Sequence, residues 1–383
     1  MLFQDKFRLH TPGPTPIPPR VQHAMAQPMI GHRSPQFSAV IADCSKRLRP
    51  IFGTEQDVLI LTSSGTSALE SAVSNTVQAG DAVTVVVTGA FGDRFAKIAE
   101  SFGCHVHRLE ITWGEHCSPE RLRAHLQQYP NEKAVFMTYC ETSTGVLNPI
   151  EDLAKVVREQ SEALTIVDGV SCIGAVPMEM DNWGIDIAVT GSQKALMLPT
   201  GLAFVAVSER AWRVIEQNSA PRFYLDLRAY RTHLHKQSTP YTPGVSLFFG
   251  LQEVLNMLEE QGFDNVIARH RLMMAMTRSA IRALDLPLMV RDEVASPTVT
   301  AVYGTSDLNV EDLRKMLSHL NIRLAGGQQH LKGRIFRIGH MGYCEPNDVL
   351  TVIATIEVAL KKLNYPIKLG QGMQAAEEVW AHA

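Results

Sequence analysis

The chain has 383 residues, of which 45% are hydrophobic and 20% charged, with a formal net charge of −3. This length fits a large and a smaller domain, and the charge balance gives no basis for nucleic acid or an anionic membrane surface as a partner. No run approaches the roughly 20 apolar residues of a membrane span, and the first residues lack the apolar core of a signal peptide. The six cysteines show no C-x-x-C spacing, so we expect reduced thiols and a cytoplasmic protein.

The chain opens with a proline-rich arm. Five prolines among residues 1–20 predict an extended segment with little helix or strand of its own. A helical pattern covers about 21–57, and strand-like and helix-like segments then alternate, which is typical of a mostly parallel sheet covered on both faces. The seven predicted strands are 58–63, 82–88, 105–111, 133–140, 164–168, 185–190 and 202–208, with helices such as 66–78, 93–102, 118–128 and 150–160 between them.

One connection is too short for a parallel crossover. Only seven residues separate Lys194 from Leu202, whereas a parallel crossover needs about a dozen. We therefore expect the strand 202–208 to run antiparallel to its neighbours, with Lys194 at the start of the reversing loop.

The last third of the chain has a different pattern. A long helical region at about 246–285 precedes a strand at 297–303, a helix at 310–319, a strand at 334–338 and a helix at 346–363. This order predicts a separate α+β domain. We expect an α/β protein with an arm at 1–20, a large domain at 21–262 and a small domain at 263–383.

Two predicted strands each end in one ionisable residue, Asp168 and Lys194. The carboxyl ends of parallel strands form the usual ligand site of an α/β sheet. A lysine amine paired with a carboxylate there indicates carbonyl chemistry through a Schiff base. The alternatives are an aspartate that caps the next turn and a surface lysine whose stem covers apolar surface.

Three further features fit a ligand that carries a phosphate and a flat ring. Ser64-Gly65-Thr66 follows the first strand and opens a helix, so its backbone N–H groups suit a phosphate, although it also reads as an ordinary N-cap. Phe91 follows the second strand and could stack on a ring or belong to the core. Arg337 shares a strand face with apolar or small residues and suits bidentate capture of a carboxylate, unless it lies on the rim. The His-x-His pairs lack further ligands, so we expect no metal.

Seven motifs carry a family resemblance. In chain order they are Thr11-Pro-Gly-Pro-Thr-Pro16, Met29-Ile-Gly-His-Arg-Ser34, Ser64-Gly-Thr-Ser-Ala-Leu-Glu70, Glu141-Thr-Ser-Thr-Gly-Val146, Val167-Asp-Gly-Val-Ser171, Gly191-Ser-Gln-Lys-Ala-Leu196 and Phe336-Arg-Ile-Gly339. Through them almost the whole chain resembles class V, fold-type I pyridoxal-phosphate aminotransferases of the alanine–glyoxylate/serine–pyruvate group.

The resemblance implies pyridoxal 5′-phosphate as cofactor and assigns the site residues. Lys194 would hold the cofactor as a Schiff base and Asp168 would pair with its pyridine nitrogen. The other cofactor contacts would be Ser64, Gly65, Thr66, Phe91 (in place of a tryptophan), Thr142 and Gln193. Arg337 would grip the substrate carboxylate, with Gly31 near the substrate.

The resemblance also implies a homodimer with shared active sites. The proline-rich arm would cross onto the partner, and Tyr241 and Thr242 would reach the partner's cofactor phosphate. Which of Thr239, Tyr241 and Thr242 makes that contact stays open.

The implied reaction is a ping-pong transamination from a small L-amino acid, alanine or serine, to glyoxylate or pyruvate. A 2-aminoethylphosphonate or ureidoglycine aminotransferase is the nearest alternative, and the sequence leaves the donor open. A cysteine desulfurase is disfavoured because Gln193 stands where those enzymes have histidine. Those enzymes also need a mobile cysteine ahead of the arginine that corresponds to Arg337, and no cysteine lies between Cys172 and Cys344. A non-catalytic cofactor-binding protein is disfavoured because lysine, aspartate and phosphate turn are all kept.

Overall fold

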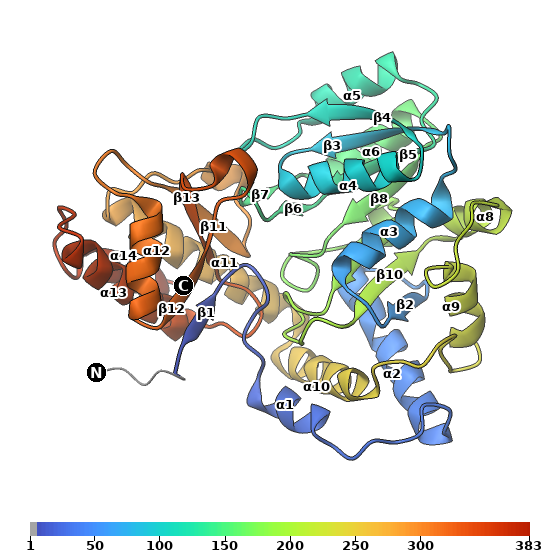
Figure 1. Ribbon diagram of the computed structural model, residues 1–383, viewed down its shortest axis with the longest axis horizontal. Helices are drawn as coiled ribbons and strands as arrows, with labels where there is room; N and C mark the ends of the chain where they lie inside the picture. The colour runs from blue at the N-terminus through green and yellow to red at the C-terminus, as the bar shows by residue number, and fades with distance from the viewer. Residues whose placement is uncertain (1–5) are drawn as a thin grey trace.

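The computed structural model describes residues 6–383 and contains a large and a small sheet, each covered by helices (Figure 1). The large sheet has seven strands. Their order is β2 (Val58–Leu61), β10 (Ala203–Val207), β9 (Ile187–Gly191), β8 (Leu164–Asp168), β5 (Ala134–Thr138), β3 (Ala82–Val87) and β4 (His105–Glu110). Strand β10 pairs antiparallel with both β2 and β9, and the other pairs are parallel. The predicted α/β fold with one antiparallel strand is confirmed.

Helices cover both faces of the large sheet because its strands are apolar on both sides. Along β2, Val58 and Ile60 enter one core, while Leu59 and Leu61 enter the other. The first core is completed mainly by α1 (Pro19–Met25), α2 (Pro35–Phe52), α5 (Pro119–Gln128), α6 (Ile150–Gln160), α7 (Met180–Trp183) and α10 (Val245–Gln261). The second is completed by α3 (Gly65–Thr76), α4 (Ala90–Ser101), α8 (Glu209–Gln217) and α9 (Leu227–Leu234).

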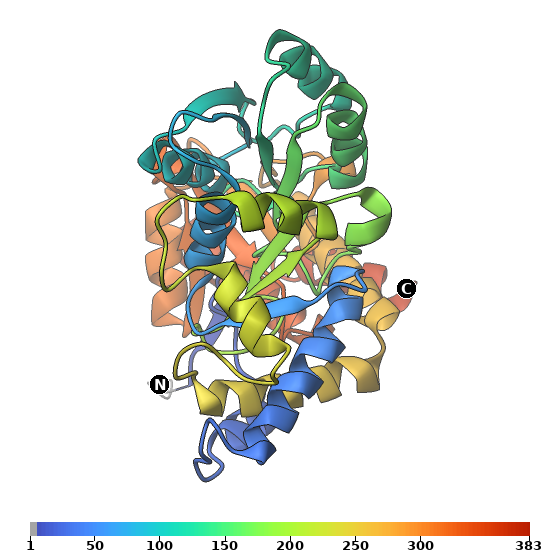
Figure 2. The same ribbon diagram turned by 90° about the vertical axis from the view of Figure 1, so that its right-hand side faces the viewer.

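The helical pattern at 21–57 forms two helices, α1 and α2. The hydroxyl oxygen of Ser34 accepts a hydrogen bond from the Phe37 N–H, and Pro35 occupies the first turn, so α2 has a well-formed N-terminus. Helix α2 lies beside α10 (Figure 2). Phe37 of α2 and Phe248 of α10 pack edge to face with ring centroids 5.3 Å apart.

The small sheet has the order β1 (Arg8–His10), β12 (Ile322–Gly326), β13 (Ile335–Gly339) and β11 (Val299–Tyr303). Its helices are α11 (Phe263–Ala283), α12 (Val310–His319), α13 (Pro346–Lys362) and α14 (Gln371–Ala381). The remaining elements are the short hairpin of β6 (Cys140–Glu141) and β7 (Val146–Leu147) and two 3-10 turns at Asp292–Val294 and Gln329–Leu331.

The small sheet differs from expectation in two strands, β1 and β12. Strand β1 lies inside the arm, which was expected to have little regular structure, and pairs in parallel with β12 of the same chain. The long helical region also breaks at Gly262, whose φ of 81° lies in the left-handed region. Because α11 packs in the core of the small sheet, we propose Gly262 as the boundary between the two domains.

No helix within residues 6–383 combines the length and the apolar character needed to cross a membrane.

Candidate active site

Most of the predicted site residues meet in one cavity at the carboxyl ends of the parallel strands. They come from β8, from the loop after β9 and from the starts of α3 and α4. The cavity is lined by Ser64, Gly65, Thr66, Leu69, Phe91, Arg94, Cys140, Thr142, Asp168, Val170, Ser171, Gln193 and Lys194. Segments far apart in the sequence therefore supply one site, as the sheet topology predicts.

Lys194 lies three residues past the end of β9, in the loop that reverses the chain into β10. Its side chain is buried, and Nζ donates a hydrogen bond to the carbonyl oxygen of Pro12 at 2.5 Å. Burial lowers the pKa of Lys194 from 10.5 to about 8; Cys140 and Asp168 oppose this shift, and Arg337 and Arg94 add to it. The amine is therefore half deprotonated near pH 8, which is the state a nucleophile or base needs.

Asp168 is the last residue of β8 and is 3% exposed. One carboxylate oxygen accepts a hydrogen bond from the Val170 N–H at 2.8 Å. Burial raises the pKa of Asp168 to about 6, and the negative charge of Glu141 adds to the rise. A cationic nitrogen placed beside this carboxylate would lower that pKa again, because opposite charges favour the ionised form. The site thus suits a protonated ring nitrogen.

The turn at the start of α3 has the features of a phosphate site. Ser64 occupies the N-cap position, yet its side chain makes no capping hydrogen bond. The Ser67 N–H donates to the Ser64 carbonyl oxygen at 3.0 Å, while the N–H groups of Gly65 and Thr66 stay available to an anion. Glycine allows a close approach here, because a β-carbon on Gly65 would lie 3.0 Å from Val170 Cγ2. The cavity wall also holds the buried Oε1 of Gln193, which has no hydrogen-bond partner within residues 6–383. The unused amide oxygen and the open helix terminus fit a phosphate-bearing polar ligand.

Arg337 lies in β13 and reaches the cavity wall through Thr142. Its Nη1 donates to the Thr142 carbonyl oxygen at 2.8 Å, and its Nε donates to the Gly326 carbonyl oxygen at 2.9 Å. Within the described chain Nη2 makes no hydrogen bond to another residue. Burial lowers the pKa of Arg337 to about 10, so the guanidinium stays charged. A carboxylate would therefore bind mainly through Nη2, because the protein holds the rest of the group.

Glu141 belongs to one of the seven motifs, and its sequence position alone predicts no role for it. Its carboxylate is fully buried and accepts hydrogen bonds from the backbone N–H groups of Phe91, Gly92 and Ser143 at 3.1 Å. Two of these donors belong to the first turn of α4. Glu141 therefore fixes the start of the helix that carries Phe91 to the cavity.

Arg94 and Cys140 also line the cavity and were not predicted. The Arg94 guanidinium carbon lies 4.8 Å from the centre of the Phe91 ring, a cation–π contact that supports the ring from its own helix. The Cys140 thiol lies 2.8 Å from the Ser296 hydroxyl oxygen, and burial raises its pKa. An arginine on an amphipathic helix and a cysteine at a strand end give no sequence signal that separates them from ordinary residues.

Four predicted residues lie outside this cavity: Arg337, which borders it through Thr142, and Gly31, Tyr241 and Thr242. Gly31 is exposed, while Tyr241 and Thr242 line a separate small pocket. The two segments are joined, because Arg33 donates to the Thr239 carbonyl oxygen at 2.5 Å. Their predicted contacts with substrate and with a partner's cofactor stay predictions.

Among residues 6–383, no three histidine, cysteine or acidic side chains are grouped so that they could hold a metal ion.

A model of the family described as aminotransferase class-V matches residues 9–345. The chain is 42% identical to a soluble hydrogenase small subunit of Synechococcus sp. (strain PCC 6716), with all of both chains covered. It is 34% identical to the serine–glyoxylate aminotransferase of Arabidopsis thaliana over 100% of this chain and 97% of the relative. Among solved structures, the ureidoglycine–glyoxylate aminotransferase of Bacillus subtilis superposes with a TM-score of 0.93 at 30% identity, covering 99% of each chain.

Proposed function

The chain belongs to the aminotransferase class-V family, and we propose that it moves an amino group from a small L-amino acid, alanine or serine, to glyoxylate or pyruvate. One observation carries this proposal. The buried amine of Lys194, the carboxylate of Asp168 and the open N-terminus of α3 line the same cavity. A reactive amine, a partner for a ring nitrogen and a phosphate site are the three groups that this chemistry requires.

We propose pyridoxal 5′-phosphate as the cofactor. Ser64, Gly65 and Thr66 would hold its phosphate, Asp168 its ring nitrogen and Phe91 one face of its ring, with Gln193 and Thr142 as further polar contacts. When bound, the cofactor supplies an aldehyde that condenses with amines and a ring that takes up the electron pair released at the substrate's α-carbon. The negative charge of Asp168 favours that uptake, because it keeps the ring nitrogen protonated.

Lys194 has two roles in the proposal. Its Nζ would hold the cofactor covalently, and the free amine would take the proton from the substrate's α-carbon. Both roles require a neutral amine, and the pKa of about 8 makes that form accessible near neutral pH. The buried position also excludes water from the proton transfer.

Arg337 would fix the substrate through its α-carboxylate. Its hydrogen bonds to the Thr142 and Gly326 carbonyl oxygens hold the guanidinium before a substrate arrives. A group held in this way loses little side-chain freedom on binding, so the carboxylate is oriented at low entropic cost.

We further propose a cytoplasmic homodimer whose partner completes each active site. The support is an exposed aromatic surface: Phe223 is 79% exposed and lies beside Tyr224 and Tyr241, whose rings stack 5.0 Å apart. Patches of this kind commonly mark interfaces. Tyr241 and Thr242 belong to this surface and not to their own chain's cavity. All six cysteines are free and buried, which agrees with a reducing compartment.

The serine–glyoxylate relative favours serine as donor, and the ureidoglycine–glyoxylate structure keeps a ureido donor as the second candidate. A half-reaction screen separates the possibilities. The cofactor-loaded protein is mixed with alanine, serine, glycine, aspartate, ureidoglycine or aminoethylphosphonate, and the absorbance of the bound cofactor is followed before glyoxylate or pyruvate is added. Loss with alanine or serine and recovery with the oxo acid supports the proposal. If only aminoethylphosphonate changes the absorbance, the donor is a phosphonate and not alanine or serine. If Lys194→Ala keeps full turnover, the proposed mechanism is wrong.

A further inference from the structure

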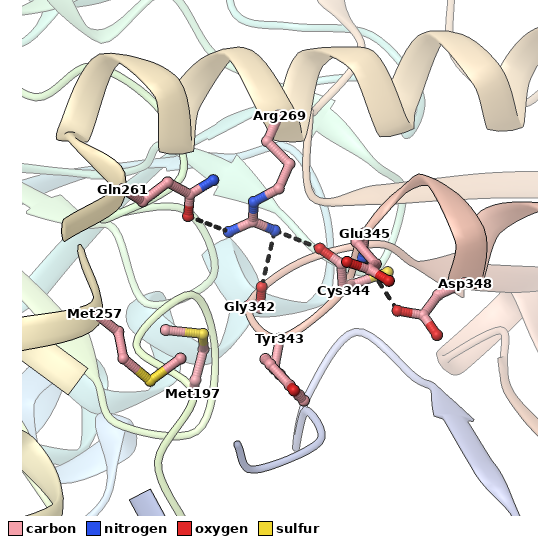
Figure 3. A pocket seen from close by; sticks show the side chains of 9 residues that line it. All are labelled: Met197, Met257, Gln261, Arg269, Gly342, Tyr343, Cys344, Glu345 and Asp348. Atoms are coloured by element: carbon pink, nitrogen blue, oxygen red, sulfur yellow. Dashed lines mark hydrogen bonds between the residues drawn. The ribbon is translucent and has the colours of Figure 1, made fainter. Parts of the chain in front are cut away.

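A second cavity lies behind the Lys194 loop, between the end of α10, the start of α11 and the segment that follows β13 (Figure 3). Its volume is about 350 Å³. It is lined by Met197, Met257, Gln261, Arg269, Gly342, Tyr343, Cys344, Glu345 and Asp348. Two of these residues, Met197 and Gly342, also contact the backbone of Lys194 in the active site.

The peptide groups of Gly342 are gripped by two consecutive residues of α11. Arg269 Nη1 donates to the Gly342 carbonyl oxygen at 3.0 Å and also to the carbonyl oxygen of Cys344, as Figure 3 shows. On the other side, the Gly342 N–H donates to Nε2 of His270 at 3.2 Å. Nδ1 of His270 lies 2.7 Å from the Val266 carbonyl oxygen, so Nδ1 carries the proton and Nε2 is free to accept.

Gly342 in turn lies against the backbone of Lys194. A β-carbon on Gly342 would lie only 2.8 Å from the Lys194 carbonyl oxygen and 3.3 Å from Met197 Cγ. The Lys194 carbonyl oxygen also accepts hydrogen bonds from the Met197 N–H at 3.0 Å and the Thr15 hydroxyl at 3.2 Å. Met197 has a φ of 56°, which side-chain-bearing residues rarely adopt, so its surroundings must hold this turn.

Packing surrounds the 342–344 segment only in part. Cys344 is buried, but the cavity borders the segment on one side and Tyr343 is 44% exposed. The hydrogen bonds from α11 add directional contacts to this segment. We propose that Arg269 and His270 are positioning residues for Lys194: by holding Gly342 against the Lys194 carbonyl oxygen, they fix the backbone from which the reactive amine extends.

This inference rests on the proposed function, in which Lys194 supplies the reactive amine. Small displacements of such a group are costly, since a misplacement of about 1 Å can lower a rate by about 100-fold. The hydrogen bonds of Arg337 and Asp168 do not involve Arg269. A loss of the clamp should therefore lower kcat while the KM for the amino donor stays unchanged.

The test compares Arg269→Met with Arg271→Met. Arg271 is the matched control because it lies two residues along the same helix, is exposed, and forms no hydrogen bond or ion pair within the described chain. The first measurement uses cofactor-free protein: reductive methylation by formaldehyde and a borohydride is followed by mass spectrometry at each pH, with the exposed Lys97 as internal standard. In wild type and in Arg271→Met, the methylation of Lys194 should reach half of its maximum near pH 8. Arg269→Met should shift the midpoint upward by about one unit, because a displaced amine is better hydrated.

The second measurement uses the loaded enzyme. Arg269→Met is expected to lower kcat by about 10- to 100-fold with little change in KM, and Arg269→Lys should restore part of it by keeping one donor. Gly342→Ala should impair the same step, because its β-carbon would press on the Lys194 carbonyl oxygen.

The inference is wrong if Arg269→Met has a lower melting temperature but the same pH midpoint of Lys194 methylation and the same kcat as Arg271→Met. If Arg269→Met does not fold, both measurements are made on Arg269→Lys. The inference is then wrong if Arg269→Lys has the same methylation midpoint and the same kcat as Arg271→Met. A wild-type protein without transaminase activity would overturn the proposed function, while the labelling midpoint would still decide on the clamp.

Discussion

The amine of Lys194 lies 2.5 Å from the carbonyl oxygen of Pro12, which joins the reactive lysine to the N-terminal arm of its own chain. The next residue, Gly13, leaves the lysine its space. A β-carbon at Gly13 would lie 2.5 Å from both Cδ and Nζ of Lys194. The arm therefore forms part of the active site of the chain to which it belongs, before any crossing onto a partner is considered.

Gly13→Ala should displace the lysine side chain and slow turnover by at least about 10-fold, since the reacting amine would leave its position. The measurement is kcat with a saturating donor. Gly80→Ala is the control, because Gly80 also has a left-handed φ but nothing lies within 4 Å of its β-carbon position. Equal losses in the two variants would show that backbone strain, and not the contact with Lys194, is responsible.

Asp168→Ala should fold but lose turnover. Removing one partner of a buried charge pair costs about 3–5 kcal/mol, which corresponds to roughly 10²- to 10⁴-fold in kcat. Asp168→Asn should be similarly slow, because its neutral amide cannot hold a protonated ring nitrogen. Steady-state rates at saturating cofactor check this, and a variant within a few-fold of wild type would contradict it.

Asp168 also makes the stability of the cofactor-free protein depend on pH. Burial raises its pKa from 3.8 to about 6, so between these values the folded protein keeps a proton that the unfolded chain releases. The contribution of Asp168 to the free energy of unfolding therefore falls as pH rises through this window, by up to about 1.4 kcal/mol per unit. Denaturant titrations give the free energy of unfolding of wild type and of Asp168→Asn at each pH. The wild-type value minus the variant value should fall as pH rises and become constant above about pH 6. A difference that does not change with pH would refute the assignment.

Glu141→Gln should loosen the start of α4. The amide keeps the volume, but its NH₂ group would face backbone N–H donors that now bind a carboxylate oxygen. Unsatisfied buried groups cost about 1–3 kcal/mol each, so we expect a lower melting temperature and about 10-fold weaker cofactor binding through a less ordered Phe91. Glu100→Gln, in an exposed position of the same helix, is the control. Unchanged cofactor affinity in Glu141→Gln would show that the carboxylate does not position Phe91.

Most of the fold could be read from the sequence because the large sheet is encoded locally. Its strands are short apolar runs, and the direction of β10 follows from the length of one loop. The small sheet was harder to predict. β12, with the sequence Ile-Arg-Leu-Ala-Gly, is half exposed, and β1 has only three residues. Their pairing joins Arg8 to Ile322 across the whole chain, so tertiary contacts decide it and not local propensity.

The site divides in the same way. The positions of Asp168, Lys194 and the turn at 64–66 in one cavity were predictable, since each lies at or just after the end of a strand and parallel strands bring their ends together. Arg94 was not, because only the rotation of α4 decides which of its charges faces the cavity. The predicted role of Tyr241 and Thr242 depends on contacts with a second chain, so contacts within one chain do not decide it.

Mixed dimers test whether Tyr241 and Thr242 act on the partner's cofactor. We expect the double variant Tyr241→Phe/Thr242→Ala and the variant Lys194→Ala each to be nearly inactive at a cofactor concentration that just saturates wild type. In a mixed dimer, one site would carry both defects, but the other would combine an intact Lys194 with an intact partner segment.

Unfolding and refolding the two variants together should therefore restore activity, to about a quarter of the wild-type value for random pairing in a two-fold dimer. A mixture of Lys194→Ala with Asp168→Asn is the control. Both residues line their own chain's cavity, so every mixed site keeps one defect and no activity returns. If the first mixture stays as inactive as the control, Tyr241 and Thr242 do not act across the interface, because only that arrangement leaves one site of the mixed dimer intact.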